Sequence, residues 1–205
     1  MRVVVIDYKA GNLTSVLKSL HHLGAETLVT DAPVPLESAE RIVLPGVGHF
    51  AATARLDATG LTPAIRAAIA HGVPFLGICV GMQWLYAGST EAPEQPGLGH
   101  FQESCTRFPE VGEKVPHVGW NSLDPRPGSR LLAGVAPGAF VYFTHSYKAP
   151  VTADTAATAT YIEPFAAAVE RGNVMGVQFH PEKSGDTGLK ILGNFLSWQT
   201  GGAPC

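Results

Sequence analysis

Hydrophobic residues in the first half of the chain follow a pattern that alternates between strands and helices. Residues 2–6 form a nearly continuous β-branched run, which is typical of a strand buried on both faces. Apolar residues then recur at helical spacing from Leu13 to Leu23, and Gly24 follows as a stop signal. Further apolar runs predict strands at residues 27–30, 41–44 and 73–78. This alternation predicts a parallel sheet with right-handed crossovers.

Turn and cap residues locate the helices of this half. The polar residues of the 12–14 segment (Asn-Leu-Thr) are interpreted as the start of the first helix. Thr62 and Pro63 predict the N-cap and the first position of a second helix, which ends at Gly72. A third helix is expected at residues 82–87, directly after the fourth strand.

The pattern changes after about Ser89. Residues 89–99 are rich in Pro, Gly and Glu and predict a surface loop. Short strands are expected after it, at residues 102–108, 115–122, 139–147, 155–162 and 165–170. An apolar strand at 173–179 and an amphipathic helix at 188–198 follow. The expected fold is one α/β domain over residues 1–205, with a mostly parallel central sheet flanked by helices and an antiparallel-rich extension in the second half.

Composition narrows the function classes. Charged residues make up 15% of the 205 residues and the formal net charge is -3, so no basic surplus is available for a nucleic-acid partner. The three cysteines, Cys79, Cys105 and Cys205, stand far apart. They match neither a disulfide framework nor a metal pattern, which indicates a reducing, cytoplasmic compartment. The longest apolar stretch, residues 73–87, is too short and too interrupted to span a membrane.

The sharpest local feature is the segment Gly77-Ile78-Cys79-Val80-Gly81, between a predicted strand and a predicted helix. It is the cysteine version of the nucleophile elbow, whose glycines make room for a strained strand-to-helix turn. Such a turn directs the sulfur outward and places it at a helix N-terminus, which favours the thiolate. The alternative is a buried structural cysteine between two close-packing glycines.

A thiol nucleophile needs a base, and His180 is the strongest candidate. It ends the apolar strand at 173–179, and Pro181 and Glu182 follow it. The carboxyl ends of strands are where open α/β sheets build their sites. Glu182 would accept the second ring N–H of His180 and hold its tautomer. Alone, this segment is a weak signal, and a surface turn is the commoner explanation; together with Cys79 it predicts a Cys-His-Glu triad.

An oxyanion hole would complete this site. The backbone N–H of Val80, directly after the nucleophile, is one expected donor. The glycine-rich segment Pro45-Gly46-Val47-Gly48 ends the third strand, and Val47 and Gly48 are candidates for the second donor. An ordinary strand-to-helix loop explains this segment equally well. No dinucleotide fingerprint and no Walker A sequence is present, so no nucleotide cofactor is expected.

These motifs, in this order, resemble the class I (triad) glutamine amidotransferases over essentially the whole chain. The resemblance rests on residues 77–83 (GICVGMQ), 44–48 (LPGVG) and 178–184 (QFHPEKS). It implies that Cys79 attacks the side-chain amide of glutamine, forming a thioester that water releases as glutamate. It also implies that Gln83 and Gly46 contact the substrate glutamine. Val80 replaces the commoner leucine, which changes little because only its N–H is used.

Two further strings resemble one branch of that family, the glutaminase subunits of imidazole glycerol phosphate synthases. They are residues 116–121 (PHVGWN) and 142–147 (YFTHSY). This resemblance implies a heterodimer with a (β/α)8-barrel cyclase subunit, which takes up the ammonia. The products are imidazole glycerol phosphate and an aminoimidazole carboxamide ribotide in histidine biosynthesis. Trp120, Asn121 and Tyr142 are then expected to face the partner, and no cofactor is required.

Several alternatives remain open at this level. The chain could serve pyridoxal phosphate or anthranilate synthesis, although the 117–121 string argues against both. A stand-alone hydrolase or stress protein with a cysteine elbow would not need Glu182, and a non-catalytic glutaminase-like scaffold subunit would not need the triad. His117 and His145 are interpreted as structural, and Cys105 and Cys205 as bystanders. The remaining histidines are expected to be exposed or in loops: His21, His22, His49, His71 and His100.

Overall fold

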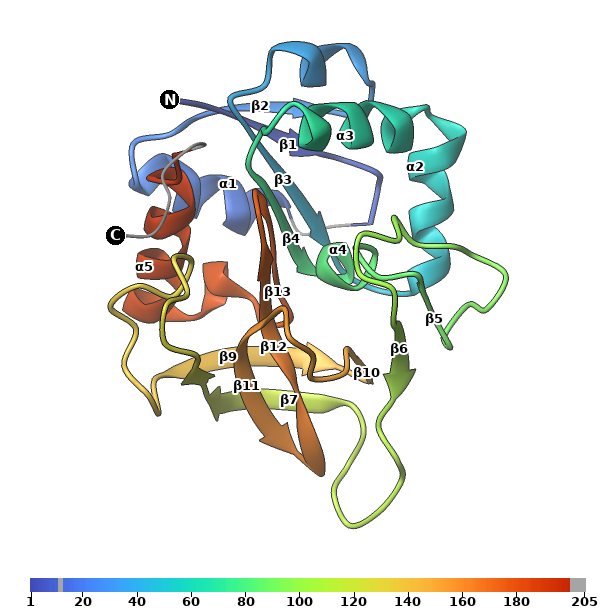
Figure 1. Cartoon of the computed structure of the whole chain (residues 1–205), viewed down its shortest axis with the longest axis vertical. Coiled ribbons are helices and arrows are strands. Elements are labelled where there is room, and N and C mark those ends of the chain that lie inside the picture. Colours follow the sequence, from blue (N-terminus) through green and yellow to red (C-terminus); the bar gives the residue numbers. More distant parts are fainter. Residues whose placement is uncertain (11–12, 200–205) are drawn as a thin grey trace.

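An eight-stranded sheet forms the centre of the computed structural model, which describes residues 1–10 and 13–199 (Figure 1). The strand order is β2-β1-β3-β4-β13-β12-β11-β8. The first five strands in this order are parallel, and they are β2 (Glu26–Thr30), β1 (Arg2–Ile6), β3 (Arg41–Gly46), β4 (Phe75–Cys79) and β13 (Val174–Val177). The last three join antiparallel, and they are β12 (Glu163–Arg171), β11 (Thr155–Tyr161) and β8 (Asp124–Pro125). The expected fold class is therefore confirmed.

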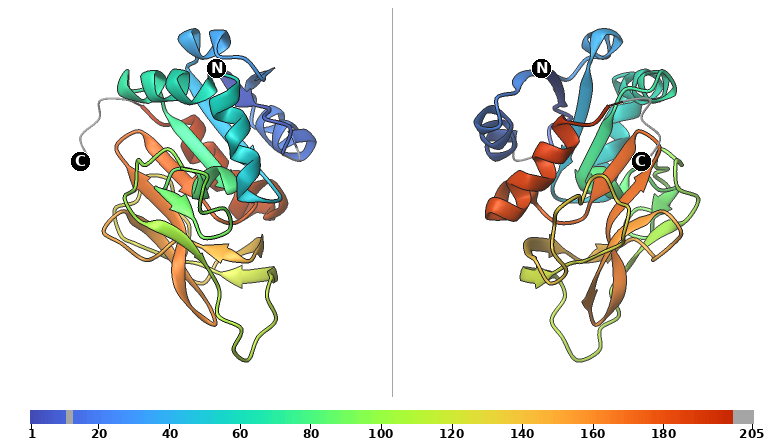
Figure 2. Two further views of the ribbon diagram at one scale, coloured as in Figure 1. Left: turned by 90° about the vertical axis from the view of Figure 1, so that its right-hand side faces the viewer. Right: turned by 60° about the vertical axis from the view of Figure 1, so that its left-hand side comes forward.

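Helices cover both faces of the parallel part, which explains why its central strands are nearly continuous apolar runs. Two helices pack on one face, α1 (Leu13–His22) and α5 (Gly185–Leu196). The opposite face carries α2 (Ala54–Ala58) and α3 (Leu61–Ala70) (Figure 2). The shorter helical segments are η1 (Val34–Ser38), η2 (Phe50–Thr53), α4 (Val80–Gln83) and η3 (Pro181–Lys183). No helix in the described part of the chain is long and apolar enough to cross a membrane.

Two small sheets extend the antiparallel half. One is a two-stranded ribbon, formed by β7 (His117–Ser122) and β9 (Phe140–His145). The other has the order β10-β6-β5, with β10 (Tyr147–Lys148), β6 (Ser104–Arg107) and β5 (Gly88–Ser89). The single strand expected at 139–147 is therefore wrong, because the chain bends at Ser146 and the two pieces pair with different neighbours.

The expected helix starts and ends need two further corrections. Helix α3 begins at Leu61, after Gly60 in a left-handed conformation, so Thr62 is not its N-cap. The Thr62 hydroxyl is buried without a hydrogen-bond partner among the described residues. The helix expected at 82–87 is also wrong, because α4 ends at Gln83. The carbonyls of the following residues instead accept N–H groups from the 97–101 loop.

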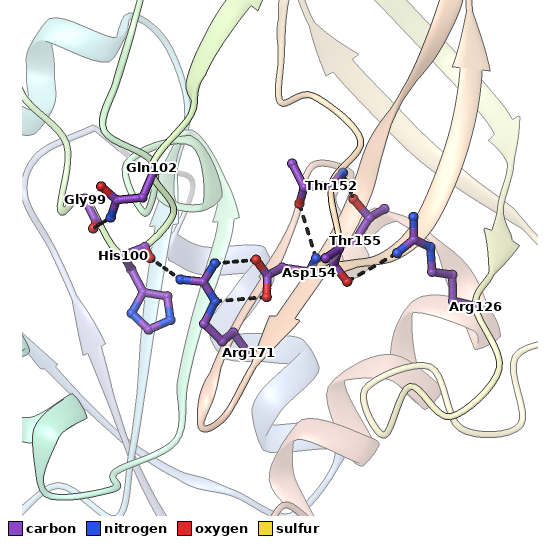
Figure 3. A network of polar contacts seen from close by, with 9 residues as sticks. Gly99, His100, Gln102, Arg126, Thr152, Asp154, Thr155 and Arg171 are labelled. Atoms are coloured by element: carbon purple, nitrogen blue, oxygen red, sulfur yellow. Dashed lines mark hydrogen bonds and ion pairs between the residues drawn. The ribbon is translucent and has the colours of Figure 1, made fainter.

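That loop is held in place by an ion pair at the end of β12 (Figure 3). The guanidinium of Arg171 pairs with both carboxylate oxygens of Asp154 and donates a hydrogen bond of 2.6 Å to the His100 carbonyl. The same group lies 4.8 Å from the ring centroid of Phe101. Residues 97–101 are thus fixed from the side of the large sheet, next to the end of α4.

Candidate active site

Strand β4 and helix α4 meet at Cys79 in the elbow that the sequence predicts. Cys79 has a φ of 55°, a conformation that residues other than glycine rarely adopt. A Cβ atom at Gly77 would overlap the carbonyl oxygen of Gly81, and one at Gly81 would overlap that of Leu44. The two glycines are therefore required by close backbone approach, and the elbow shape is confirmed.

His180 follows β13, the strand that pairs with β4. Its Nδ1 lies 2.8 Å from Oε1 of Glu182, and the two side chains are only 1% and 2% exposed. Burial lowers the pKa of His180, but Cys79 and Glu182 raise it by more, and the result is about 9. The imidazole therefore holds its proton at neutral pH. Its Nε2 is buried and makes no hydrogen bond within the described residues, so it is available to a reacting group.

Strand β9 fixes the position of this base. The His180 N–H donates to the Tyr142 carbonyl at 2.9 Å. The Ser184 hydroxyl donates to the His180 carbonyl at 2.6 Å and accepts the Tyr142 N–H at 2.9 Å. The segment that carries the base is thus tied to the β7–β9 ribbon on one side and to the large sheet on the other.

Cys79 and His180 line one cavity of about 260 Å³. This volume is near the lower end for ligand pockets and suits a molecule of amino-acid size. The other sequence-predicted residues in its lining are Val47, Gly48, Val80 and Gln83. The sequence did not single out four more, which are Glu91, Thr144, Ser146 and Tyr147. Three of these lie in the 142–147 string, whereas Glu91 lies in a segment that was interpreted only as a loop.

The oxyanion-hole candidates differ from one another in the structure. Val80 is the first residue of α4, so its N–H has no partner within the helix. The Gly48 N–H has no hydrogen-bond partner among residues 1–10 and 13–199, and Gly48 has a φ of 90°. Val47 requires a correction: its N–H donates to the Ala10 carbonyl at 2.8 Å and is not offered to the cavity.

Two expected substrate contacts also have other partners. Gly46 is not part of the cavity lining. A Cβ at Gly46 would overlap the buried Tyr8 hydroxyl and lie 2.9 Å from the Gly81 nitrogen, so its role is close packing beneath the elbow. Gln83 does line the cavity, but its amide nitrogen donates to the Tyr147 carbonyl and to Oε1 of Gln178, both at 3.0 Å.

The three residues expected to face a partner do not share one face of the β7–β9 ribbon. Trp120 is 56% exposed, and its ring packs edge-on against that of Tyr142, with 6.1 Å between the ring centroids. Asn121 points the other way, because neighbouring residues of a strand alternate between faces. Its amide donates to the Thr160 carbonyl at 2.9 Å. Asn121 connects β7 to β11, and its interface role stays a prediction.

His117 and His145 form a buried pair, as their structural interpretation requires. Nδ1 of His117 lies 3.0 Å from Nε2 of His145, and the ring of His117 stacks on Tyr161 and Phe143. Burial lowers the pKa of His117 to about 4 and that of His145 to about 3, so both rings are neutral at pH 7.

The other expected bystanders also lie where the sequence suggests. The remaining histidines are exposed or in loops, which confirms that expectation for His21, His22, His49, His71 and His100. Cys105 is fully buried, and burial raises its pKa, so its thiol is inert. Asn12 and Cys205 lie outside the described residues.

Comparisons with known proteins agree with this geometry. The family model "Glutamine amidotransferase class-I" matches residues 4–198. The chain is 45% identical over 202 residues to the imidazole glycerol phosphate synthase subunit HisH of Methanosarcina acetivorans, covering 95% of this chain and 98% of that protein. It is 47% identical over 201 residues to the subunit of the same name from Cyanothece sp., covering 95% of each.

Solved structures share the fold at lower identity. A glutamine amidotransferase crystal structure superposes with a TM-score of 0.74 at 20% identity and covers 94% of this chain and 98% of its own. A chain in the structure of PurLQS from Thermotoga maritima gives a TM-score of 0.73 at 20% identity. The match covers 95% of this chain and 97% of that chain. At this identity the likeness supports the arrangement of strands and helices alone.

Proposed function

The chain belongs to the class I glutamine amidotransferase family, with the function of a glutaminase subunit of imidazole glycerol phosphate synthase, and we propose that Cys79, His180 and Glu182 perform its amide hydrolysis. One observation carries the proposal. A cysteine on a strained elbow shares a small cavity with a buried histidine, and that histidine is hydrogen-bonded to a buried carboxylate.

The proposed reaction uses the charge state of His180. Because its pKa is about 9, the imidazole holds a proton at neutral pH beside the Cys79 sulfur. The Cys79 thiolate attacks the amide carbon, a C–S bond forms, and the negative charge moves to the amide oxygen. His180 then gives its proton to the nitrogen, the C–N bond breaks and ammonia leaves. Water attacks the thioester, His180 accepts a proton from it, and the C–S bond breaks to release glutamate.

The N–H groups of Val80 and Gly48 are the proposed donors to the transient oxyanion. Preorganised donors of this kind contribute about 3 kcal/mol each where they have been tested. Val47 can join them only if its hydrogen bond to Ala10 is broken.

Glu91 is the proposed partner of the glutamine α-amino group. It lines the cavity, and its Oε2 accepts the Phe50 N–H at 2.7 Å, which fixes the carboxylate at the start of η2. A fixed carboxylate suits an ammonium group, and Glu91→Gln should therefore raise the KM for glutamine with a smaller effect on kcat.

The outer face of the β7–β9 ribbon is the proposed surface for the cyclase subunit, which we expect to be a (β/α)8 barrel. Three exposed side chains and one half-buried ring form an apolar patch on this face: Val118, Trp120 and Phe140 are exposed, and Tyr142 is half-buried. Ribbon strand β9 is the strand that holds His180. A partner seated there would sit next to the base and could take up the ammonia for imidazole glycerol phosphate formation. Cys79 and Cys105 are free thiols, and a reducing compartment keeps thiols in this state, so the cytoplasm is the proposed location.

The proposal is tested by glutamate release in the presence of the cyclase and its ligand. Cys79→Ala should abolish release, and Cys105→Ala should retain it as the matched cysteine control. Full activity of Cys79→Ala would overturn the triad. Trp120→Ala should weaken association with the cyclase by about 2 kcal/mol. Unchanged affinity in that variant would remove the ribbon from the interface.

A further inference from the structure

Gln178 contacts the reacting sulfur, although the mechanism above gives it no role. This side chain is fully buried, directly after β13, and its Nε2 lies 3.6 Å from Sγ of Cys79. Helix α4 spans only four residues and sums few peptide dipoles at Cys79. Besides the protonated His180 ring, the sulfur therefore receives little stabilisation from the helix, and a neutral N–H donor directed at it has a clear use.

The orientation of the Gln178 amide follows from its neighbours, since oxygen and nitrogen of an amide must be assigned from hydrogen bonds. The Tyr147 carbonyl can only accept, so the group of Gln83 that lies 3.0 Å from it is the NH₂. The second hydrogen of that NH₂ is directed at Gln178, which must present its oxygen there. The NH₂ of Gln178 is consequently left facing the sulfur.

The carbonyl at the start of this chain of hydrogen bonds is itself fixed. It also accepts from Nδ1 of His145 at 2.9 Å, and the other nitrogen of that ring is bonded to His117. Both histidines are buried, one on β7 and one on β9, and both rings contact that of Phe108, the residue after β6. Tyr147 therefore presents an acceptor of constant position to Gln83.

We propose that Gln178 is a further catalytic residue, whose amide N–H stabilises the Cys79 thiolate, and that Gln83 is a positioning residue that holds the Gln178 amide in this orientation. The inference rests on Cys79 being the nucleophile. It gives Gln83 a task in the free protein that does not depend on bound glutamine. No proton is transferred by either amide; Gln178 only donates a hydrogen bond to the charged sulfur, where such bonds are stronger than between neutral groups.

The test is the pH dependence of Cys79 alkylation by iodoacetamide in the full chain, followed by mass spectrometry of the Cys79 peptide. Gln178→Met removes the donor at similar length and should raise the midpoint by about one pH unit, which is a tenfold lower thiolate fraction below the midpoint. Gln178→Glu keeps an acceptor for Gln83 but turns a carboxylate toward the sulfur, so its midpoint should rise further. Gln102→Met, at an exposed glutamine bonded to Gly99, is the matched control and should not shift.

Gln83→Met separates positioning from substrate binding. A positioning role predicts a raised midpoint, smaller than that of Gln178→Met, and a double variant that shifts no further than Gln178→Met alone. A residue that only binds glutamine would raise KM and leave the midpoint unchanged, which would overturn the role of Gln83. Should the methionine variant not fold, as judged by circular dichroism, Gln178→Glu carries the test.

Wild-type midpoints in both Gln178 variants would overturn the proposal. This failure is distinct from a failure of the proposed function. Alkylation reports on the thiol alone, whereas the function fails only if Cys79→Ala still releases glutamate.

Discussion

Two buried histidine sites adjoin strand β9, and they differ in charge at neutral pH, because His180 is protonated and the His117–His145 pair is neutral. His180 is paired with the carboxylate of Glu182, and its pKa is raised to about 9. His145 is paired with the neutral ring of His117, and its pKa is lowered to about 3. Burial lowers the pKa at both sites, so the difference comes from the two groups that raise the pKa of His180, the Cys79 sulfur and the Glu182 carboxylate. Of these two sites, the one with negative groups placed against the ring keeps its proton at neutral pH, and the other does not.

Removing the Glu182 carboxylate should reduce the difference in charge between the two histidine sites, and we expect it to have the largest effect on activity. In Glu182→Gln the pKa of His180 should fall, because burial is then less opposed. Glutaminase activity of the complex should drop by about 10²–10⁴-fold. The descending limb of kcat, which we expect as pH rises through about 9 in the wild type, should move to lower pH. A variant that keeps both the rate and the limb would show that Glu182 does not set the charge of His180.

The raised pKa of His180 also predicts how stability depends on alkaline pH. An unfolded histidine has a pKa of 6.5, and the folded value is about 9. The stabilisation is therefore fully present below pH 6.5 and is lost as the pH rises through about 9. Urea unfolding between pH 6.5 and 9.5 should show this loss in the wild type and less of it in His180→Phe. Equal slopes in the two proteins would contradict the assignment.

The neutral His117–His145 pair predicts that stability depends on pH in the opposite sense at acidic pH. Its effect on function should be smaller. The folded pKa values of about 4 and about 3 lie below 6.5, so the unfolded chain binds protons first. Stability should therefore fall as the pH drops from 6.5 toward 4. His117→Phe preserves the ring stack with Tyr161 and should lose less stability over this range. The same urea series, run downward in pH, measures this, and an unchanged acid slope would count against a buried neutral pair.

Local features of the sequence predicted the strained elbow at Cys79 correctly. The elbow at Cys79 depends on glycines two positions away, so five consecutive residues contain most of the information. The neighbourhood of His180 was similarly visible, because its strand, its proline and Glu182 are contiguous. The parallel half of the sheet followed from apolar runs of helix and strand length.

Features that depend on distant partners could not be predicted from these patterns. Asn121 adjoins Trp120 in sequence, but the pleat of β7 turns it toward Thr160. Val47 lies in a glycine-rich segment that suits an oxyanion loop, but its N–H donates to the Ala10 carbonyl. Helix α4 ends at Gln83 because the carbonyls of residues 84–87 accept hydrogen bonds from N–H groups of the 97–101 loop. Helical periodicity in the sequence does not reveal such a contact.

Covalent labelling by a glutamine analogue is the sharpest test of Cys79 as the nucleophile activated beside His180 and Glu182. The complex with the cyclase would be incubated with 6-diazo-5-oxo-L-norleucine, and the labelled peptide identified by mass spectrometry. We expect one adduct, on Cys79, with a rate that falls sharply in Glu182→Gln. An adduct on Cys105 with Cys79 unmodified, or undiminished labelling of Cys79 in Glu182→Gln, would contradict it.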